Sequence, residues 1–435
     1  MKKAFLLCRN SKYVLVITGF LYVYDSSGTS KVVKAHEVIF NESGIDYIVL
    51  HPISLKGYST DCYGITVNKK YLGIITHLEL INFLYNLQVS NKKAIGILIH
   101  HLIHNKIENI KSIIEGFKCI PVVVYLHDFY TCCTNYNLLR NNEYFCAKDC
   151  IRCNGCLFEK KRIEHFYEIK AFFKYLIDNV KFVAPSDFTK DIWIKFYPEY
   201  EDKVVIIPHL KEHGKCALNT EFINYNQSLR IAYIGAQLKI KGWPLVKNIF
   251  NQCIVHQCNY QYYYFGSGSE VVKNVKNINV QIHLQGKNAM INNLRKYRID
   301  VVLLPAICPE TYSYTMHESF AANSFVITLE SSGNIATVIR NFNKGKIFSD
   351  ATTISAYLLN EKILRKDVNS WKRQNEGPLY YDDNDEIINL YKLNKTYDFN
   401  KGLTRINVKD IIKKHILILA YNVKNTLNYL LNKGV

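Results

Sequence analysis

The sequence predicts an α/β protein made of two Rossmann-like domains that face each other across a cleft. Short apolar runs recur along the chain, and each is followed by a polar loop and a segment with helical spacing. This pattern stops at a polar, irregular stretch between His213 and Ser228 and then begins again. The 435 residues are too many for one hydrophobic core and enough for two.

Residues 1–215 are expected to form the first domain. A small-residue loop before its first expected helix contains Ser27, Gly28 and Thr29. Free N–H groups at that helix start can face a phosphate or an acceptor, although an ordinary capped turn has the same composition. His127 follows the apolar run Pro121–Leu126, at the carboxyl end of a parallel strand, where α/β sheets bind ligands. His127 there either orients a substrate hydroxyl or bonds to nearby backbone.

Residues 226–395 repeat the pattern and are expected to form the second domain. Within it, the apolar run Asp300–Leu304 leads through a loop into a segment with helical spacing. Glu310 lies in that loop and Glu318 lies in the helix, eight residues later. A phosphate at the helix N-terminus, with one carboxylate on a sugar and the other on a ribose, would make a nucleotide-sugar site. The alternative is a helix cap followed by one solvated glutamate.

Six cysteines lie within 25 residues of one another in a predicted insertion at 131–160. Cys153 and Cys156 have the spacing of a metal knuckle, and Cys133 with Cys146, or with Cys150 as a substitute, would complete four ligands. The cluster therefore predicts a structural zinc ion that orders the insertion, and the alternative is a set of free thiols.

Composition indicates a globular chain with an excess of positive charge. Hydrophobic residues make up 48%, charged residues make up 21%, and the formal net charge is +18. The charge favours a nucleic acid, an anionic membrane or phosphorylated substrates as partners, or else reflects a lysine-rich composition. No apolar run reaches the roughly 20 residues that span a bilayer, and Arg9 and Lys12 interrupt the weak apolar N-terminus. We therefore expect a cytoplasmic protein with reduced cysteines.

The last segment, 405–435, is amphipathic, with lysines beside Ile, Leu, Tyr and Val residues. Such a helix either packs back on the first domain or lies on an anionic membrane surface.

The second half of the sequence resembles the donor domain of retaining glycosyltransferases of family 4, which have the GT-B fold. The features that carry the resemblance occur in the family's order: Gly235 with Lys241-Gly242, Phe265–Gly268, Gln285-Gly286, and Pro309-Glu310 followed by Glu318–Asn323. The first half agrees through His127–Tyr130, Ala184–Ser186 and Ile207–His209, and its cysteine cluster resembles a subgroup acting in bacterial surface-polysaccharide synthesis. Ala236 stands where the family commonly has arginine, and Thr311 and Ser313 stand where it has glycines.

The resemblance implies transfer of a sugar from a nucleotide diphosphate sugar to a glycan, a lipid-linked glycan or a protein, with retention of configuration and without a catalytic metal. It implies catalytic roles for His127, Lys241 and Glu310. It implies donor contacts from Gly235, Lys239, Lys241, Gly266, Gln285, Gly286, Glu310, Tyr312, Ser313, Tyr314 and Glu318. The loop of Ser27, Gly28 and Thr29 would border the acceptor. In such a protein, peripheral contact with the inner face of the membrane fits the positive charge.

Two other functions compete with this one. A catalytically silent GT-B module that binds a partner would also tolerate the departures at Ala236 and Thr311. A nucleic-acid-binding protein would use the positive charge and the cysteine cluster, but it requires basic residues gathered with exposed aromatics. The lysines here are scattered, so no nucleic-acid partner is expected.

Overall fold

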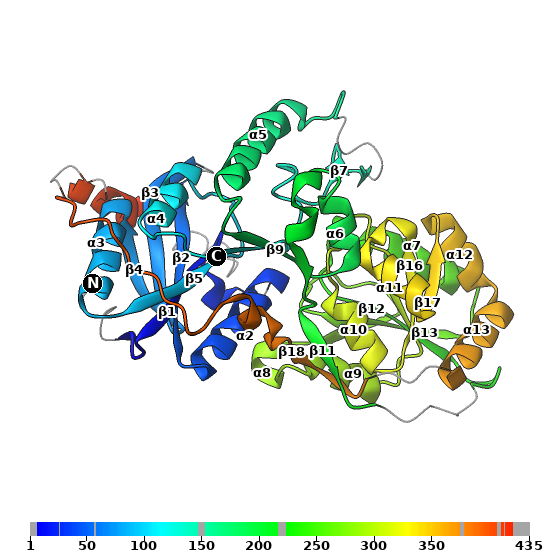
Figure 1. Cartoon of the computed structure of the whole chain (residues 1–435). Helices are drawn as coiled ribbons and strands as arrows, with labels where there is room; N and C mark the ends of the chain where they lie inside the picture. The colour runs from blue at the N-terminus through cyan, green and yellow to red at the C-terminus, as the bar shows by residue number, and fades with distance from the viewer. Residues whose placement is uncertain are drawn as a thin grey trace.

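The structure, a computed structural model, describes residues 7–25, 27–55, 58–146, 153–215, 223–374, 378–406, 410–412 and 414–420. Within this part of the chain, two α/β domains lie side by side, each built around its own sheet (Figure 1). This arrangement confirms the predicted α/β class with two Rossmann-like halves. No helix in the described ranges is long and apolar enough to cross a membrane.

The first domain contains an eight-stranded sheet with the order β10-β9-β6-β5-β1-β2-β3-β4. Its strands are β1 (Lys12–Ile17), β2 (Ile45–Leu55), β3 (Tyr58–Val67), β4 (Lys70–Thr76), β5 (Lys93–Ile99), β6 (Val122–Tyr125), β9 (Val180–Ala184) and β10 (Val204–Ile206). The strands from β10 to β2 are parallel, so the order reverses between β1 and β5. Such a reversal is where open α/β sheets bind ligands.

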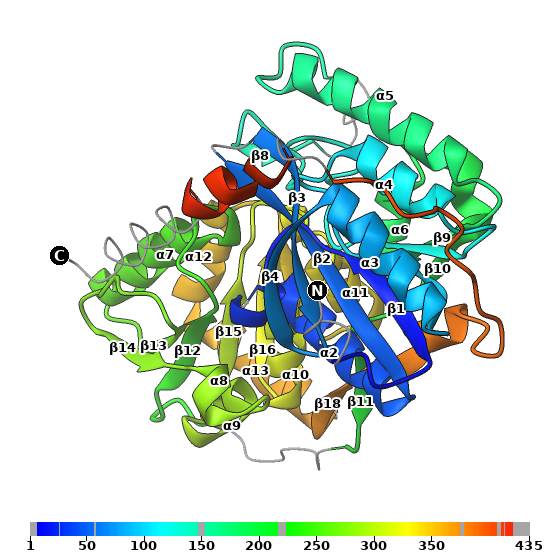
Figure 2. The same ribbon diagram turned by 90° about the vertical axis from the view of Figure 1, so that its left-hand side faces the viewer.

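Helices cover both faces of this first sheet. They are α2 (Gly28–Glu42), α3 (His77–Val89), α4 (Ile107–Glu115), α5 (Glu159–Tyr175) and α6 (Asp187–Trp193). Side chains of α2 form the core on one face, and side chains of α3, α4 and α5 form the core on the other. Figure 2 shows the edge hairpin of β3 and β4 on this domain. Asn68 and Lys69 make its two-residue turn, with the positive φ angles (47° and 68°) that such turns require.

The second domain contains a six-stranded parallel sheet with the order β14-β13-β12-β15-β16-β17. Its strands are β12 (Leu229–Ile234), β13 (Tyr260–Gly266), β14 (Val275–Asn279), β15 (Val301–Leu304), β16 (Phe325–Leu329) and β17 (Gly345–Phe348). Its helices are α7 (Trp243–Val255), α8 (Ile282–Gln285), α9 (Ala289–Lys296), α10 (Tyr314–Ala321), α11 (Asn334–Phe342), α12 (Ala351–Leu359) and α13 (Glu361–Gln374). The strand order reverses between β12 and β15, as in a dinucleotide-binding sheet.

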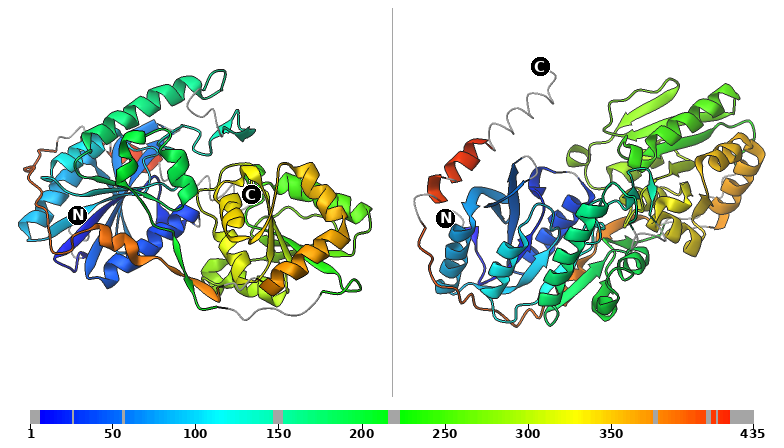
Figure 3. Two further views of the ribbon diagram at one scale, coloured as in Figure 1. Left: turned by 45° about the vertical axis from the view of Figure 1, so that its right-hand side comes forward. Right: turned by 90° about the horizontal axis from the view of Figure 1, so that it is seen from above.

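The chain crosses between the domains twice. On the way out, β11 (Leu210–His213) pairs with β18 (Tyr380–Asp383), which carries the chain back (Figure 3). The returning residues then pack on the first domain, where Ile387 and Tyr391 join its core and the Phe399 ring lies 4.9 Å from that of Phe117. The second domain therefore ends near β18, before the predicted boundary at residue 395.

Residues 410–412 and 414–420 of the C-terminal segment are helical. Lys414 Nζ lies 2.8 Å from both carboxylate oxygens of Glu79 on α3. This contact connects the segment to the first domain, and packing on that domain or on a membrane surface stays a prediction. Four large apolar side chains nevertheless point to solvent with exposures of 45–66%: Ile411, Ile412, Ile416 and Leu419. Residues 421–435 of the predicted helix lie outside the described residues.

Candidate functional site

A cleft of about 540 Å³ lies between the two domains, at the carboxyl ends of strands from both sheets. The loops after β12 and β15 form its second-domain side, and the N-terminus of α2 and the residues after β6 form its first-domain side. The strand-order reversal of the second sheet therefore opens into this cleft. The volume is within the usual range for small-molecule sites.

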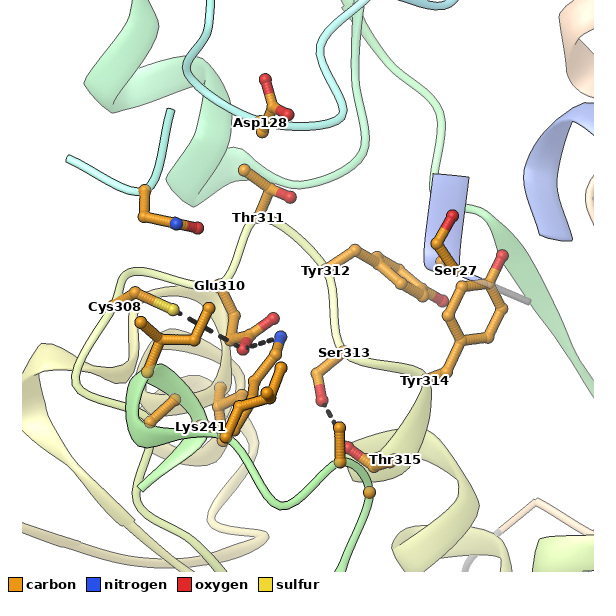
Figure 4. A pocket seen from close by; sticks show the side chains of 18 of the residues that line it. Ser27, Asp128, Lys241, Cys308, Glu310, Thr311, Tyr312, Ser313, Tyr314 and Thr315 are labelled. Carbon is orange, nitrogen blue, oxygen red and sulfur yellow. Dashed lines mark hydrogen bonds and ion pairs between the residues drawn. The ribbon is translucent and has the colours of Figure 1, made fainter. Parts of the chain in front are cut away.

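Lys241 and Glu310 form an ion pair in this cleft (Figure 4). Lys241 ends the short helix η3 (Lys239–Lys241), and the next residue, Gly242, has a φ angle of 81°. A Cβ atom at Gly242 would lie 2.0 Å from the carbonyl oxygen of Pro305, so only glycine lets the loop after β12 approach the end of β15 this closely. This close approach places the Lys241 ammonium against Glu310.

The backbone of Glu310 is held by the start of α11. The N–H of Glu310 donates to the carbonyl of Ser332 (3.3 Å), and the N–H of Asn334 donates to the carbonyl of Glu310 (2.8 Å). The side chain of Glu310 is 11% exposed and that of Lys241 is 39% exposed. Burial alone would lower the pKa of Lys241, but the charge of Glu310 offsets it and leaves the pKa raised. The ammonium is therefore a permanent cation at neutral pH, available to an anionic ligand.

The N-terminus of α10 opens into the same cleft. Ser313 caps this helix, and its Oγ accepts a hydrogen bond from the N–H of Met316 at 3.2 Å. Tyr312, Ser313 and Tyr314 all line the cleft, as Figure 4 shows. Free N–H groups and the helix dipole attract anions, so α10 and Lys241 together create positive potential on the second-domain side.

Thr311 ties the loop after Glu310 to the first domain. The Oγ1 atom of Thr311 donates to the carbonyl of His127 at 2.5 Å. The carbonyl of Thr311 accepts hydrogen bonds from Ser186 Oγ (2.8 Å) and Thr189 Oγ1 (3.1 Å). A glycine at this position could not make the first of these contacts, so the threonine side chain adds a contact between the domains.

The N-terminus of α2 forms the opposite wall. Ser27, Gly28 and Thr29 line the cleft, as the sequence predicts. Lys31, one turn further along α2, also lines the cleft, and its Nζ lies 4.8 Å from the ring centroid of Tyr314. The two helix N-termini and the two lysines thus face one shared space. Such a space favours a ligand with several negative charges.

Two buried histidines complete the first-domain wall. His127 and His209 line the cleft, and each is 9% exposed. Burial lowers the pKa of both imidazoles well below the ordinary value, and neighbouring histidines add to the effect. Both rings are therefore neutral at pH 7, which suits hydrogen bonds to hydroxyl groups better than pairing with phosphate.

Not every predicted donor-site residue lies in this cleft. Gly235 lines it, whereas Lys239, Gly266, Gln285, Gly286 and Glu318 lie outside its lining. Glu318 is 8% exposed within α10; burial raises its pKa, and the charge of Lys31 acts in the opposite direction. Gly266 has a supporting role, because a Cβ there would lie 2.5 Å from the carbonyl oxygen of Gly235.

Several cleft residues have no role that was predicted from the sequence. Those with polar side chains include Lys31, Tyr136, His209, Tyr233 and Cys308. A signal exists only for Lys31, because a cation one turn into a helix that starts at a ligand loop faces the same side as the loop. Cys308 is buried beside Glu310, and burial raises the pKa of its thiol to about 12, so it is an unreactive thiol at neutral pH.

The structure describes four of the five predicted zinc ligands. Cys153 and Cys156 lie in one turn, where the N–H of Cys156 donates to the carbonyl of Cys153 at 3.1 Å. Cys150 lies outside the described residues. Among the residues described, no three His, Cys, Asp or Glu side chains come together closely enough to hold a metal ion. The zinc site stays a prediction.

Comparisons with known proteins gave similarity in structure only. No protein-family model and no curated protein sequence matches the chain. The fold is similar to that of WaaG, a glycosyltransferase involved in lipopolysaccharide biosynthesis, with a TM-score of 0.50 and 13% identity over 83% of this chain and 94% of WaaG. Sucrose-phosphate synthase from Thermosynechococcus elongatus has a TM-score of 0.49 and 11% identity over 83% of this chain and 94% of that protein. Anabaena HepE in complex with UDP has a TM-score of 0.48 and 10% identity over 83% of this chain and 93% of HepE. The chain has the GT-B fold, as predicted.

Proposed function

We propose that this protein is a glycosyltransferase that moves a sugar from a nucleotide diphosphate sugar to a glycan or another acceptor. The observation that carries the proposal is the Lys241–Glu310 pair beside the open N-terminus of α10, in a cleft shared by two Rossmann-like domains. A cation with helix N–H groups suits a diphosphate, and a neighbouring carboxylate suits sugar hydroxyls. A donor of this class needs both.

In the proposed reaction, Lys241 and the N–H groups at the start of α10 hold the diphosphate. Negative charge builds on the diphosphate as its bond to the sugar breaks, so donors placed there stabilise the transition state most. The Lys241–Glu310 pair suggests an order of events for this step. An arriving diphosphate attracts Lys241, and Glu310 is then released to accept hydrogen bonds from the donor sugar.

His127 completes the sugar site from the first domain. Because its imidazole is buried and neutral, it can share a hydrogen bond with a sugar hydroxyl without repelling the developing positive charge on the sugar. The acceptor would enter along Ser27, Gly28 and Thr29, which border the same cleft. The contact of Glu318 with the donor ribose remains part of the proposal, with this side chain 8% exposed and outside the cleft lining.

The finer parts of the proposal follow the resemblance to family 4. The reaction would retain the anomeric configuration, and a diphosphate oxygen would take the proton of the acceptor. Lys241 and the α10 dipole supply the positive charge that a catalytic metal supplies in other enzymes. A surface polysaccharide or other glycoconjugate is the acceptor that we propose, since WaaG, which shares the fold, acts in lipopolysaccharide biosynthesis. The protein would work in the cytoplasm, with peripheral contact at the membrane.

The test is a panel of UDP, GDP, dTDP and CMP sugars, screened first for thermal stabilisation and then for transfer or slow hydrolysis. We expect one nucleotide class to stabilise the protein and its sugar to be released or transferred. Glu318→Ala should then abolish donor binding or turnover while the folded structure remains intact. Binding without release or transfer of any sugar would favour the silent GT-B module instead, and no binding by any member of the panel would contradict the proposal.

A further inference from the structure

Three buried side chains connect the interior of the first sheet to the cleft. Tyr47 on β2 is fully buried, and its hydroxyl oxygen lies 3.2 Å from His100 Nε2. His100, which directly follows β5, is 1% exposed, and its Nδ1 lies 2.8 Å from His127 Nε2. His127 follows β6 and lines the cleft. The strands β2, β5 and β6 are parallel members of one sheet, with β1 between β2 and β5, and their side chains meet in one row on the same face.

The far end of this row has an unused nitrogen. The Nδ1 atom of His127 is buried and has no hydrogen-bond partner in the part of the chain that the structure describes. Buried polar atoms in native proteins nearly always have a partner. Since the side chain of His127 borders the cleft, a bound ligand can supply that partner.

The direction of the hydrogen bonds can be worked out from the chemistry of the three groups. Burial lowers the pKa of His100 and of His127 well below the ordinary value, so each imidazole is neutral and has one donor and one acceptor nitrogen. The Tyr47 hydroxyl has a proton to donate, and among the described residues its hydrogen-bond partner is His100 Nε2. With His100 Nε2 as the acceptor and the proton of His100 on Nδ1, the buried Tyr47 proton has a partner, whereas the opposite direction would leave that proton without one.

The same reasoning extends one step further. His100 Nδ1–H donates to His127 Nε2, so the proton of His127 must be on Nδ1. His36 does not oppose this arrangement. Its Nδ1 lies 3.4 Å from His100 Nε2, at the outer limit of a hydrogen bond, and it too can donate to that nitrogen.

We propose that Tyr47 and His100 hold His127 in the Nδ1–H tautomer, so that His127 presents an N–H donor to an oxygen atom of the bound ligand. Tyr47 and His100 are positioning residues, because neither borders the cleft. The inference rests on the proposed function for the identity of the ligand, which would be the donor sugar, and the oxygen would belong to one of its hydroxyl groups.

The test measures the tautomer directly. In protein labelled with ¹⁵N-histidine, the protonated and unprotonated ring nitrogens of a neutral imidazole give well-separated signals, and His127→Gln identifies the His127 signals by their loss. We expect Nδ1 of His127 to carry the proton in the wild-type protein. In Tyr47→Phe, which removes only the first donor, we expect His127 to become a mixture of the two tautomers.

Tyr63→Phe is the matched control. It removes another buried tyrosine hydroxyl from the same sheet, where Tyr63 is 2% exposed on β3, and it should leave the His127 tautomer unchanged. A wild-type proton on Nε2 of His127, or an unchanged tautomer in Tyr47→Phe, would overturn the proposal. If Tyr47→Phe does not fold, the wild-type spectrum alone decides.

A kinetic measurement adds a second readout that does not depend on the spectra. Where a donor sugar is known, Tyr47→Phe should lower kcat/KM roughly tenfold, as expected for one weakened hydrogen bond to the substrate. The two tests are separable, because the spectra are recorded on the unliganded protein. If the protein transfers no sugar, the proposed function is contradicted. The spectra of the unliganded protein still show whether the hydrogen bonds run from Tyr47 through His100 to His127.

Discussion

Replacing Lys241 by methionine tests the centre of the proposed site. The substitution keeps an unbranched side chain and removes the ammonium that pairs with Glu310. A charge-assisted hydrogen bond contributes about 1.5–3 kcal/mol, and each 1.4 kcal/mol changes affinity tenfold. Lys241→Met should therefore weaken the binding of the matching nucleoside diphosphate by roughly 10- to 150-fold in a calorimetric titration.

The same substitution should lower the free energy of unfolding. Without Lys241, the Glu310 carboxylate, which is 11% exposed, is left without its cation. Breaking a fully buried pair costs about 3–5 kcal/mol, but Lys241 is 39% exposed, so we expect about 1–2 kcal/mol from denaturant unfolding.

The chain provides a matched control two residues earlier. Lys239 has the same charge and lies on the same short helix, but it stands outside the cleft lining. Lys239→Met should leave nucleoside diphosphate affinity within about twofold of wild type, which also tests the donor contact predicted for Lys239. Equal loss of affinity in both variants, or full affinity in Lys241→Met, would refute the assignment of the diphosphate to Lys241.

The remaining predictions concern the domain contact, the buried histidines and the cysteines. Thr311→Val removes one hydrogen bond between the domains at nearly constant shape, so donor affinity should fall about fivefold while Thr311→Ser stays close to wild type; equal affinities for all three would contradict this. Because burial lowers the pKa of His100 and His127, the free energy of unfolding should decline as the pH falls below about 6.5, where the unfolded chain takes up protons; a flat profile between pH 7 and 5 would count against it. Elemental analysis should find one zinc per chain, reduced in Cys153→Ser, and protein purified without metal would remove the zinc prediction.

The sequence was sufficient to predict the fold and to bring Lys241 and Glu310 together. Each apolar run followed by a loop and a helix identified a strand end, and strand ends of parallel sheets meet at one edge. Lys241 and Glu310, 69 residues apart, were assigned to one ligand through the resemblance to family 4, and the structure pairs them.

Other parts of the site depend on which strands are neighbours, and local patterns do not encode this. Tyr47, His100 and His127 follow or belong to strands that are separated by 27 to 53 residues, and their meeting requires the order β6-β5-β1-β2. The contact of Thr311 with the first domain likewise depends on how two domains dock. Local patterns likewise did not indicate that Gln285 and Gly286 lie outside the cleft lining.

The position of Thr311 directly after Glu310 couples two parts of the proposed reaction. Lys241 and the N-terminus of α10 belong to the second domain alone, so they can hold a diphosphate whether or not the domains are closed. The sugar is different, because His127 and Glu310 come from opposite sides of the cleft. The hydrogen bond from Thr311 to the carbonyl of His127 forms only when His127 and Glu310 face one another across the cleft. In the proposed reaction, donor binding would therefore begin on the second domain, and closure of the domains would then assemble the part of the site that holds the sugar.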